Sequence, residues 1–271
     1  MPELPEVETT RRGISPHILN KTIQQVIIRH HGLRWPVDKD LPQLLQQQSI
    51  NTIERRGKYL IFSLANGSIL LHLGMSGSLA IVNTNTPIRK HDHVDIVFND
   101  NTCLRFHDPR RFGAIVWTTQ AIEEHDLLKR LGPEPLTNEF NADYLWQHCH
   151  RRTTSIKQAI MNAHIVVGVG NIYASEALFL AGIRPQHKAN KLSRMKCRLL
   201  VDAIKQILHQ AIQQGGTTLK DFLQADGQAG YFTQSLCVYG REGQACERCN
   251  SNIKQIDIGQ RSSYFCPKCQ E

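Results

Sequence analysis

The sequence predicts an α+β chain of more than one domain. Residues 1 to about 120 carry alternating, strand-like segments behind one short helix, and the segments after residue 137 have helical periodicity. A small module with four of the eight cysteines closes the chain. A length of 271 residues suits two domains, or one domain with appendages.

The first helix is predicted from PEVETTRRGISPHIL. Pro5 suits a first helical turn, and Glu6 and Glu8 suit the positive end of the helix dipole. The segment has no apolar stretch of the kind that a secretory signal needs. The chain therefore begins with a structural helix, and we expect a cytoplasmic protein.

Three strand-like stretches follow, at residues 22–29, 58–75 and 93–108. The second contains Asn66-Gly67 between two apolar runs, which is a strong hairpin signal, and the third repeats the pattern around Asn99–Asn101. This region is predicted to be a β-sandwich or a barrel.

The sequence pattern changes from strand-like to helical at LGPEPLT (131–137), where two prolines and a glycine predict a domain boundary. Helices are predicted within residues 138–150, 153–163, 171–182 and 193–214. Residues 215–232 are predicted to form a long loop, and loops of that length are usually functional or disordered.

Charge favours a polyanionic partner. The formal net charge is +8, with 13 further histidines. A basic balance of this size favours nucleic acid, although a basic protein without such a partner stays possible. No apolar run reaches the length of about 18–20 residues that crosses a bilayer.

The C-terminal cysteines have metal-ligand spacing. Their pattern is C-x2-C-x16-C-x2-C, formed by Cys246, Cys249, Cys266 and Cys269. Two close thiolate pairs on two turns make a closed tetrahedral site, which is typical of one structural Zn²⁺. So small a module has too little core to fold unaided, so the metal must stabilise it.

Other motifs are open to two interpretations. In residues 162–171 a glycine turn precedes a helix with Asn171 expected as N-cap, which suits an anion site or a plain helical hairpin. Met75 between glycines and Phe112 beside arginines suit either wedges in a base stack or core side chains. Lys58, at a strand start, suits ordinary solvated surface.

Pro2 has a special chemistry if Met1 is removed, as the small second residue permits. Its secondary amine then becomes a carbonyl nucleophile that forms an iminium. An α-amine has a pKa of about 7.7–8.0, so much of it is unprotonated at neutral pH. Glu3 beside it suits proton transfer. The alternative is a proline that only starts a helix.

Taken together, the motifs resemble one family. MPELPEVETTRRG, RRGKYL, HLGMSGSL, KHDHVD, DPRRFGA, LGPEPL, VVGVGNIYASEALF, GGTTLKDF and QRSSYFCPKCQ occur in the order of the bacterial formamidopyrimidine-DNA glycosylases. The resemblance spans the chain. It implies an N-terminal β-sandwich with a leading helix, a helix–two-turn–helix domain and a C-terminal four-cysteine zinc-finger hairpin.

The resemblance implies a monomeric base-excision repair enzyme that removes oxidised purines from duplex DNA and cleaves abasic sites. Pro2 matches the nucleophile at C1′, and Glu3 matches the acid–base residue that opens the sugar. Lys58 matches the lysine assigned to phosphate contact and β-elimination. Arg261 matches the finger arginine assigned to phosphate binding and δ-elimination.

Further matches concern DNA binding. Met75, Arg110 and Phe112 match residues that fill the gap left by a flipped nucleotide. The residues at positions where the family contacts the DNA backbone are His72, His91, Arg152, Lys157 and Asn171. The matches around the lesion pocket are Glu6, Thr217, Thr218 and Tyr231, the last three in the loop 215–232 that is expected to cover the everted base.

The implied domains are residues 1–131 (catalytic), 132–235 (helix–two-turn–helix) and 236–271 (zinc finger). Two rivals remain. One is an endonuclease VIII-like glycosylase for oxidised pyrimidines, which the PELPEVET start and the intact GGTTLKDF segment disfavour. The other is a zinc-finger DNA-binding protein without chemistry, which would have no use for Pro2.

Overall fold

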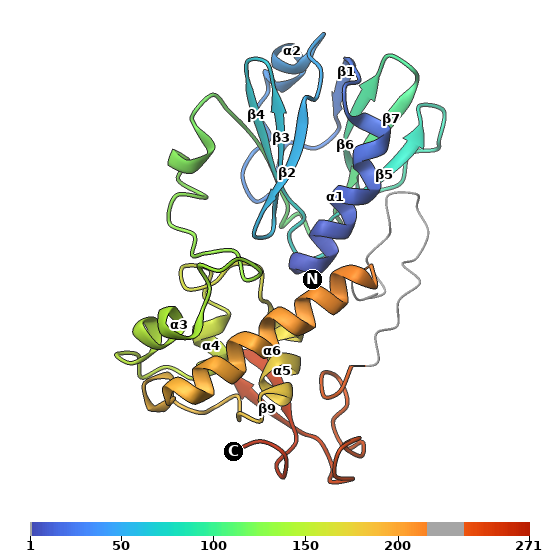
Figure 1. The fold of residues 1–271 in the computed structure, drawn as a ribbon. Helices are drawn as coiled ribbons and strands as arrows, with labels where there is room; N and C mark the ends of the chain where they lie inside the picture. The colour runs from blue at the N-terminus through green and yellow to red at the C-terminus, as the bar shows by residue number, and fades with distance from the viewer. Residues whose placement is uncertain (1, 216–235) are drawn as a thin grey trace. The chain divides into compact units, whose positions relative to one another are not determined.

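The computed structural model describes residues 2–215 and 236–271. They fall into two compact units, one made of residues 2–129 and the other of residues 130–214 with 236–271 (Figure 1). The predicted loop at 215–232 lies outside the described residues except for Gly215. In the described part of the chain, no helix is long and apolar enough to cross a membrane.

The N-terminal unit is the predicted β-sandwich with a leading helix. Two four-stranded antiparallel sheets, with the orders β1-β6-β7-β5 and β2-β3-β4-β8, follow helix α1 (Leu4–Ile18). The strands are β1 (Ile23–Ile28), β2 (Thr52–Arg56), β3 (Tyr59–Leu64), β4 (Gly67–His72), β5 (Ser78–Asn83), β6 (Asp92–Phe98), β7 (Thr102–His107) and β8 (Ala114–Thr118). The short helices are α2 (Leu41–Leu45) and the 3₁₀ turn η1 (Ile122–Glu124).

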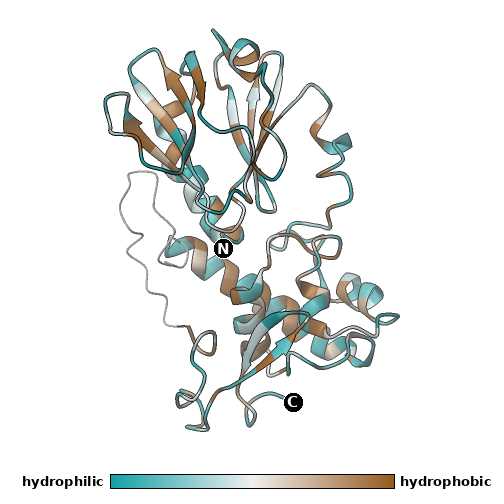
Figure 2. Ribbon diagram, turned by 180° about the vertical axis from the view of Figure 1, so that it is seen from behind, coloured by the Kyte–Doolittle hydropathy of each residue, from teal (hydrophilic) through white to brown (hydrophobic). Residues whose placement is uncertain are grey.

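One apolar core joins both sheets to α1. Ile14 and Ile18 of the helix pack with Phe62 of one sheet and with Phe98 and Leu104 of the other, and all are at most 2% exposed. In Figure 2 the strands of the sandwich contain many hydrophobic (brown) residues, whereas the connecting loops are mostly hydrophilic. Burial of this apolar surface fixes α1, and therefore the chain end, against the sandwich.

Both predicted hairpins form. Residues 99–101 connect β6 and β7, with Asn101 in the left-handed region at φ 64°. In the β3–β4 hairpin, Leu64 pairs with Gly67, so the turn residues are Ala65 and Asn66 rather than Asn66 and Gly67. Gly67 instead opens β4 where a Cβ would lie 2.6 Å from the Trp117 ring, so close packing explains this glycine.

The second unit is helical, as predicted. Its helices are α3 (Ala142–Cys149), α4 (Ile156–Ile160), α5 (Asn171–Leu180), η2 (Ala189–Lys191) and α6 (Arg194–Gln213). The prediction that Asn171 caps α5 was wrong, because Gly170 is the N-cap and Asn171 is the first helical residue. The Asn171 side chain instead donates to the finger, at the Ser262 carbonyl (3.0 Å).

The finger contains an antiparallel hairpin formed by β9 (Lys254–Ile258) and β10 (Arg261–Phe265). Its two turn residues, Gly259 and Gln260, have φ values of 56° and 61°. Positive φ at both positions makes a tight turn whose twist matches that of the strands. A small core of Val238, Ile253 and Cys266 packs on Phe179 of α5, so the finger belongs to the helical unit.

Candidate functional site

The chain end is buried and hydrogen-bonded. Pro2 is buried, and Glu3 is only 1% exposed. The Glu6 carboxylate accepts a bond from the Glu3 amide (2.8 Å), as in a capping box, and the Val7 amide donates to the Glu3 carbonyl (3.1 Å). Glu6, expected near the lesion pocket, therefore also fixes the residue that follows Pro2.

A buried carboxylate connects this helix to the turn that carries Lys58. Glu8 of α1 accepts from Arg55 of β2 (3.2 Å), and Arg55 also donates to the Gly57 carbonyl (3.0 Å). Burial raises the pKa of Glu8, but hydrogen bonds from Arg11 and Arg12 outweigh it and lower that pKa to about 2. Glu8 stays ionised, so it holds Arg55 against the base of the turn.

His72 lies at the end of β4. Its Nδ1 accepts from the Gly74 amide (2.9 Å), and its ring packs 4.8 Å from that of Tyr59. Burial, with the charges of Lys58 and Arg34, lowers the pKa of His72 to about 4. The ring is therefore neutral at pH 7, with its proton on Nε2, and can donate to a phosphate oxygen without carrying charge.

Two loops, residues 73–77 and 108–113, present the expected wedge residues. Met75 and Phe112 are 39% and 45% exposed, so neither is a core side chain. The Arg110 guanidinium lies 5.0 Å from the centre of the Phe112 ring. A Cβ on Gly74 would lie 2.4 Å from the Phe112 backbone, so glycine permits the close approach of the two loops.

Asp108, which sequence reasoning did not single out, joins these loops. It is completely buried, and its two oxygens accept from Ser76 Oγ (2.9 Å) and from the Gly113 amide (2.7 Å). Ser76 Oγ in turn accepts from the Arg110 amide (3.3 Å). Asp108 is part of the motif DPRR, but the neighbouring sequence does not indicate which groups its carboxylate contacts.

In the helical unit, Lys157, Asn171 and Arg261 all lie by the finger hairpin. Lys157 is 1% exposed and donates to Ser263 Oγ (2.7 Å) and to the Ser262 carbonyl (3.2 Å), which also accepts from Asn171. Lys157 and exposed Arg261 line one cavity of about 220 Å³. Two cations at one small cavity suit an anion.

The remaining expected residues are scattered. Exposed Arg152 donates to the His148 carbonyl (2.9 Å), and His91 lies on the segment before β6 with its ring 6.1 Å from that of His93. The three expected lesion-pocket residues of the loop lie outside the described residues; they are Thr217, Thr218 and Tyr231.

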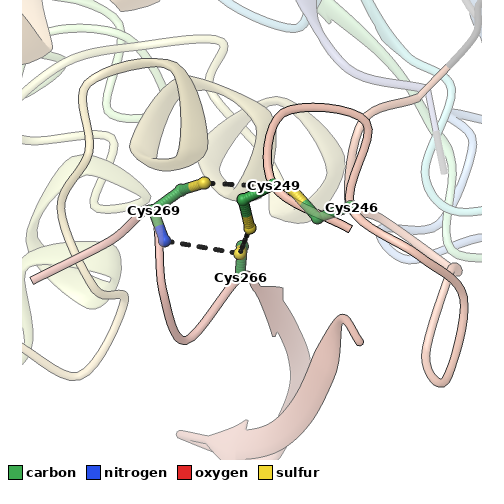
Figure 3. Close-up of side chains that lie close together, drawn as sticks. All are labelled: Cys246, Cys249, Cys266 and Cys269. Atoms are coloured by element: carbon green, nitrogen blue, oxygen red, sulfur yellow. Dashed lines mark hydrogen bonds between the residues drawn. The ribbon is translucent and has the colours of Figure 1, made fainter. Parts of the chain in front are cut away.

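The four finger cysteines form one cluster (Figure 3). Their Sγ atoms all lie within 4.8 Å of one another, with Cys246 and Cys269 3.9 Å apart and Cys249 and Cys266 3.4 Å apart. Zn–S bonds of about 2.3 Å in a tetrahedron place the sulfurs about 3.8 Å apart. The donor set therefore fits one structural zinc, which leaves no ligand position open for chemistry.

Glu176 is a second residue that sequence reasoning missed. This carboxylate of α5 is 3% exposed and accepts from three successive amides, those of Cys237, Val238 and Tyr239, at 2.8–2.9 Å. An acidic residue inside the apolar run of α5 was the available signal. It anchors the first described residues of the finger module to the helical unit.

Family models match three parts of the chain. They are described as the formamidopyrimidine-DNA glycosylase N-terminal domain (residues 1–115), the H2TH domain of the same enzyme (131–223) and a zinc finger found in FPG and IleRS (243–271). A sandwich whose second residue is a buried proline, a helix–two-turn–helix domain and a four-thiolate finger define a DNA-repair glycosylase.

Whole-chain comparisons make the assignment specific. Formamidopyrimidine-DNA glycosylases of Thioalkalivibrio sulfidiphilus and Saccharophagus degradans are 55% and 53% identical, over 100% of both chains in each case. Solved MutM (Fpg) from Thermus thermophilus has a TM-score of 0.89 at 36% identity, covering 99% of this chain and 98% of that one. A Lactococcus lactis Fpg mutant in complex with DNA containing Fapy-dG has a TM-score of 0.92 at 34% identity over 100% of both chains. The chain belongs to the formamidopyrimidine-DNA glycosylase family.

Proposed function

We propose that this enzyme removes oxidised purines, 8-oxoguanine and formamidopyrimidines, from duplex DNA and then cleaves the strand at the abasic site. The observation that carries the proposal is the chain end: Pro2 is buried beside Glu3, at the start of a helix held by the sandwich core. Relatives solved with DNA containing an abasic site and with DNA containing Fapy-dG support the substrate class.

In the proposed reaction, the amine of Pro2, freed of Met1, attacks C1′ of the damaged nucleotide. The bond from C1′ to the base breaks, and the base leaves with a proton. Glu3 protonates the ring oxygen as the sugar opens, which leaves an iminium between C1′ and the Pro2 nitrogen. Hydrolysis of the final iminium releases the enzyme.

Two eliminations cleave the strand. Loss of a C2′ proton expels the 3′ phosphate, and loss of a C4′ proton in a second elimination expels the 5′ phosphate. We assign phosphate binding for the first to Lys58 and for the second to Arg261, each as a cation near a leaving phosphate. The zinc supports the finger and takes part in no bond change.

The damaged nucleotide must leave the base stack of the duplex before Pro2 can attack its C1′. We assign the resulting gap to Met75 and Phe112, which stack, and to Arg110, which hydrogen-bonds the orphaned cytosine. Backbone contacts are assigned to His72, His91, Arg152, Lys157 and Asn171. Glu6 is assigned to the lesion pocket, with Thr217, Thr218 and Tyr231.

The parts divide the work. We assign catalysis to residues 1–131, DNA binding and lesion capping to 132–235, and phosphate contact to the finger at 236–271. The enzyme acts as a monomer on duplex DNA. Because its relatives are bacterial and its substrate is the chromosome, we place it in the cytoplasm.

Borohydride trapping tests the proposal. The wild-type enzyme should form a covalent adduct with an 8-oxoguanine:C duplex, and Pro2→Gly should lower the yield at least about 100-fold. Glycine keeps a small second residue, so removal of Met1 proceeds in both proteins. Pro16→Ala, an exposed proline of α1, is the matched control. Binding without trapping would refute the enzymatic proposal, and faster trapping on thymine glycol:A would favour the pyrimidine rival.

A further inference from the structure

The loops 73–77 and 108–113, here called the wedge loops, meet at one residue that the sandwich holds in place. Asp108 directly follows β7. Its amide donates to the His91 carbonyl (3.0 Å), and its carbonyl accepts from His93 Nε2 (2.8 Å). The backbone of Asp108 is therefore fixed to β6 and to the segment before it.

The side chain of Asp108 bonds both wedge loops. It is completely buried, and a buried carboxylate is unfavourable unless hydrogen bonds satisfy its oxygens. One oxygen accepts from Ser76 Oγ (2.9 Å) and the other from the Gly113 amide (2.7 Å). Ser76 Oγ in turn accepts from the Arg110 amide (3.3 Å). A single carboxylate thus connects the two loops to each other and to the sheet.

Each of these bonds lies next to a wedge side chain. Ser76 directly follows Met75. The Gly113 amide belongs to the peptide bond that joins Phe112 to Gly113. The third bond is donated by the amide of Arg110 itself. The network therefore fixes the backbone at all three wedge residues, while their side chains stay exposed.

The sequence of the second loop suits this arrangement. Asp108 and Pro109 begin a four-residue turn, which the Arg111 amide closes by donating to the Asp108 carbonyl (3.3 Å). Aspartate is favoured at the first position of the commonest such turns, and proline, whose φ is fixed, at the second. The turn places Arg110 at its third position, where the amide reaches Ser76 Oγ.

We propose that Asp108 is a positioning residue that holds Met75, Arg110 and Phe112 as one preformed unit, so that the three side chains enter the base stack together. The inference rests on the proposed function, which assigns these three residues to the gap left by an everted nucleotide. Groups that the fold already holds in place fill such a gap without a further loss of backbone entropy. A misplacement of about 1 Å can slow a reaction about 100-fold.

The network also bears on the choice of the opposite base. A hydrogen bond from Arg110 to the orphaned cytosine needs donor and acceptor atoms about 2.7–3.2 Å apart. The backbone of Arg110 is fixed through Ser76, whose hydroxyl relays the hold of Asp108. Loss of the Ser76 hydroxyl should therefore relax the selection of cytosine, whereas loss of the Asp108 carboxylate should impair gap filling as a whole.

Two substrates separate positioning from chemistry. An 8-oxoguanine:C duplex requires extrusion of the base and filling of the gap, whereas a single strand with an aldehydic abasic site requires neither. In single-turnover borohydride trapping with enzyme in excess, Asp108→Asn should be about 100-fold slower than the wild type on the duplex and equal to it on the single strand. Asparagine keeps the size of the side chain but replaces one acceptor oxygen with an amide group that cannot accept a hydrogen bond. Asp40→Asn, at an exposed position, is the matched control and should change neither rate.

Ser76→Ala tests the relay to Arg110. The ratio of the excision rates on 8-oxoguanine:C and 8-oxoguanine:A duplexes should fall about tenfold, because a misplaced guanidinium discriminates less between the opposite bases. Thermal unfolding checks that each variant is folded at the assay temperature. If Asp108→Asn is not folded, Ser76→Ala carries the comparison of duplex and single strand, since it removes a hydrogen bond between the same two loops.

Equal slowing on both substrates would mean that the carboxylate only stabilises the fold, and unchanged rates on both would mean that it has no part in gap filling. Either result overturns the proposal. An unchanged opposite-base ratio in Ser76→Ala overturns the relay to Arg110. A wild-type enzyme that traps neither substrate refutes the proposed function instead, so the two failures are distinguishable.

Discussion

In the N-terminal unit, Pro2 and Glu3 directly precede helix α1, whose apolar residues enter a core shared by two sheets. In the second unit, Arg261 stands on a two-stranded hairpin whose support is a four-thiolate site, a few apolar side chains and buried polar bonds. The first region is held by burial of many nonpolar groups, and the second by a few strong, specific bonds. The N-terminal unit and the finger should therefore lose their folded structure under different conditions.

Removal of zinc should produce the largest difference between the regions. In Cys246→Ser, hydrogen exchange at residues 254–265 should become fast, while residues 59–72 stay protected, because structural zinc supplies about 10 kcal/mol to such modules. Trapping of the 8-oxoguanine duplex should fall about 100-fold. Cys237→Ser removes a finger thiol outside the cluster, and it should retain both the protection of residues 254–265 and the trapping of the 8-oxoguanine duplex. Fast exchange in both regions would mean that the units do not fail separately.

Loss of the Glu176 charge should loosen the finger without touching its metal. Glu176→Gln weakens the acceptor of three amide bonds, and we expect a loss of about 3 kcal/mol in local stability. Hydrogen exchange at residues 237–239 measures it. Asp202→Asn, an exposed carboxylate on α6, should change nothing. Unaltered exchange in Glu176→Gln would show that the metal alone holds this segment.

Acid should affect the N-terminal unit through Glu8. Its pKa is about 2 in the folded chain, against 4.5 as the ordinary value. The stabilisation is therefore complete above about pH 4.5 and disappears as pH falls through about 2. Glu8→Gln should cost about 2 kcal/mol at pH 7 and almost nothing at pH 2, measured by thermal unfolding. Exposed Glu54 is the control position, as Glu54→Gln, and an equal cost at both pH values would contradict the linkage.

The smallest expected effect concerns Arg261. Arg261→Ala should reduce the slope of log affinity against log salt by about 1, because one phosphate contact is lost. Fluorescence anisotropy with duplex DNA between low and moderate salt measures the slope. Lys254→Ala, an exposed cation at the far end of the same hairpin, should leave the slope unchanged. An unchanged slope in Arg261→Ala would remove this residue from the phosphate-binding set.

Prediction from sequence worked where the signal is local. The hairpin around Asn99–Asn101, the long helix α6 and the cysteine spacing each depend on residues close in the chain. It failed for contacts between distant residues. Asp108 bonds Ser76 across 32 positions, Arg55 bonds Glu8 across 47, and Glu176 bonds Cys237 across 61. No periodicity or propensity reports such pairings, since they depend on how finished elements pack.

The sequence by itself determined the order of elements, the four-thiolate ligand set and the family to which the chain belongs. Only the tertiary structure decided that Met75 and Phe112 are exposed, that Lys157 is buried against the finger, and that Gly170 rather than Asn171 caps α5. It also decided that the rings of His30, His93, His91 and His107, from separate strands and loops, follow one another at 5.3–6.1 Å. The physical reason is that residue type and spacing set local conformation, whereas burial and side-chain pairing are properties of the packed chain.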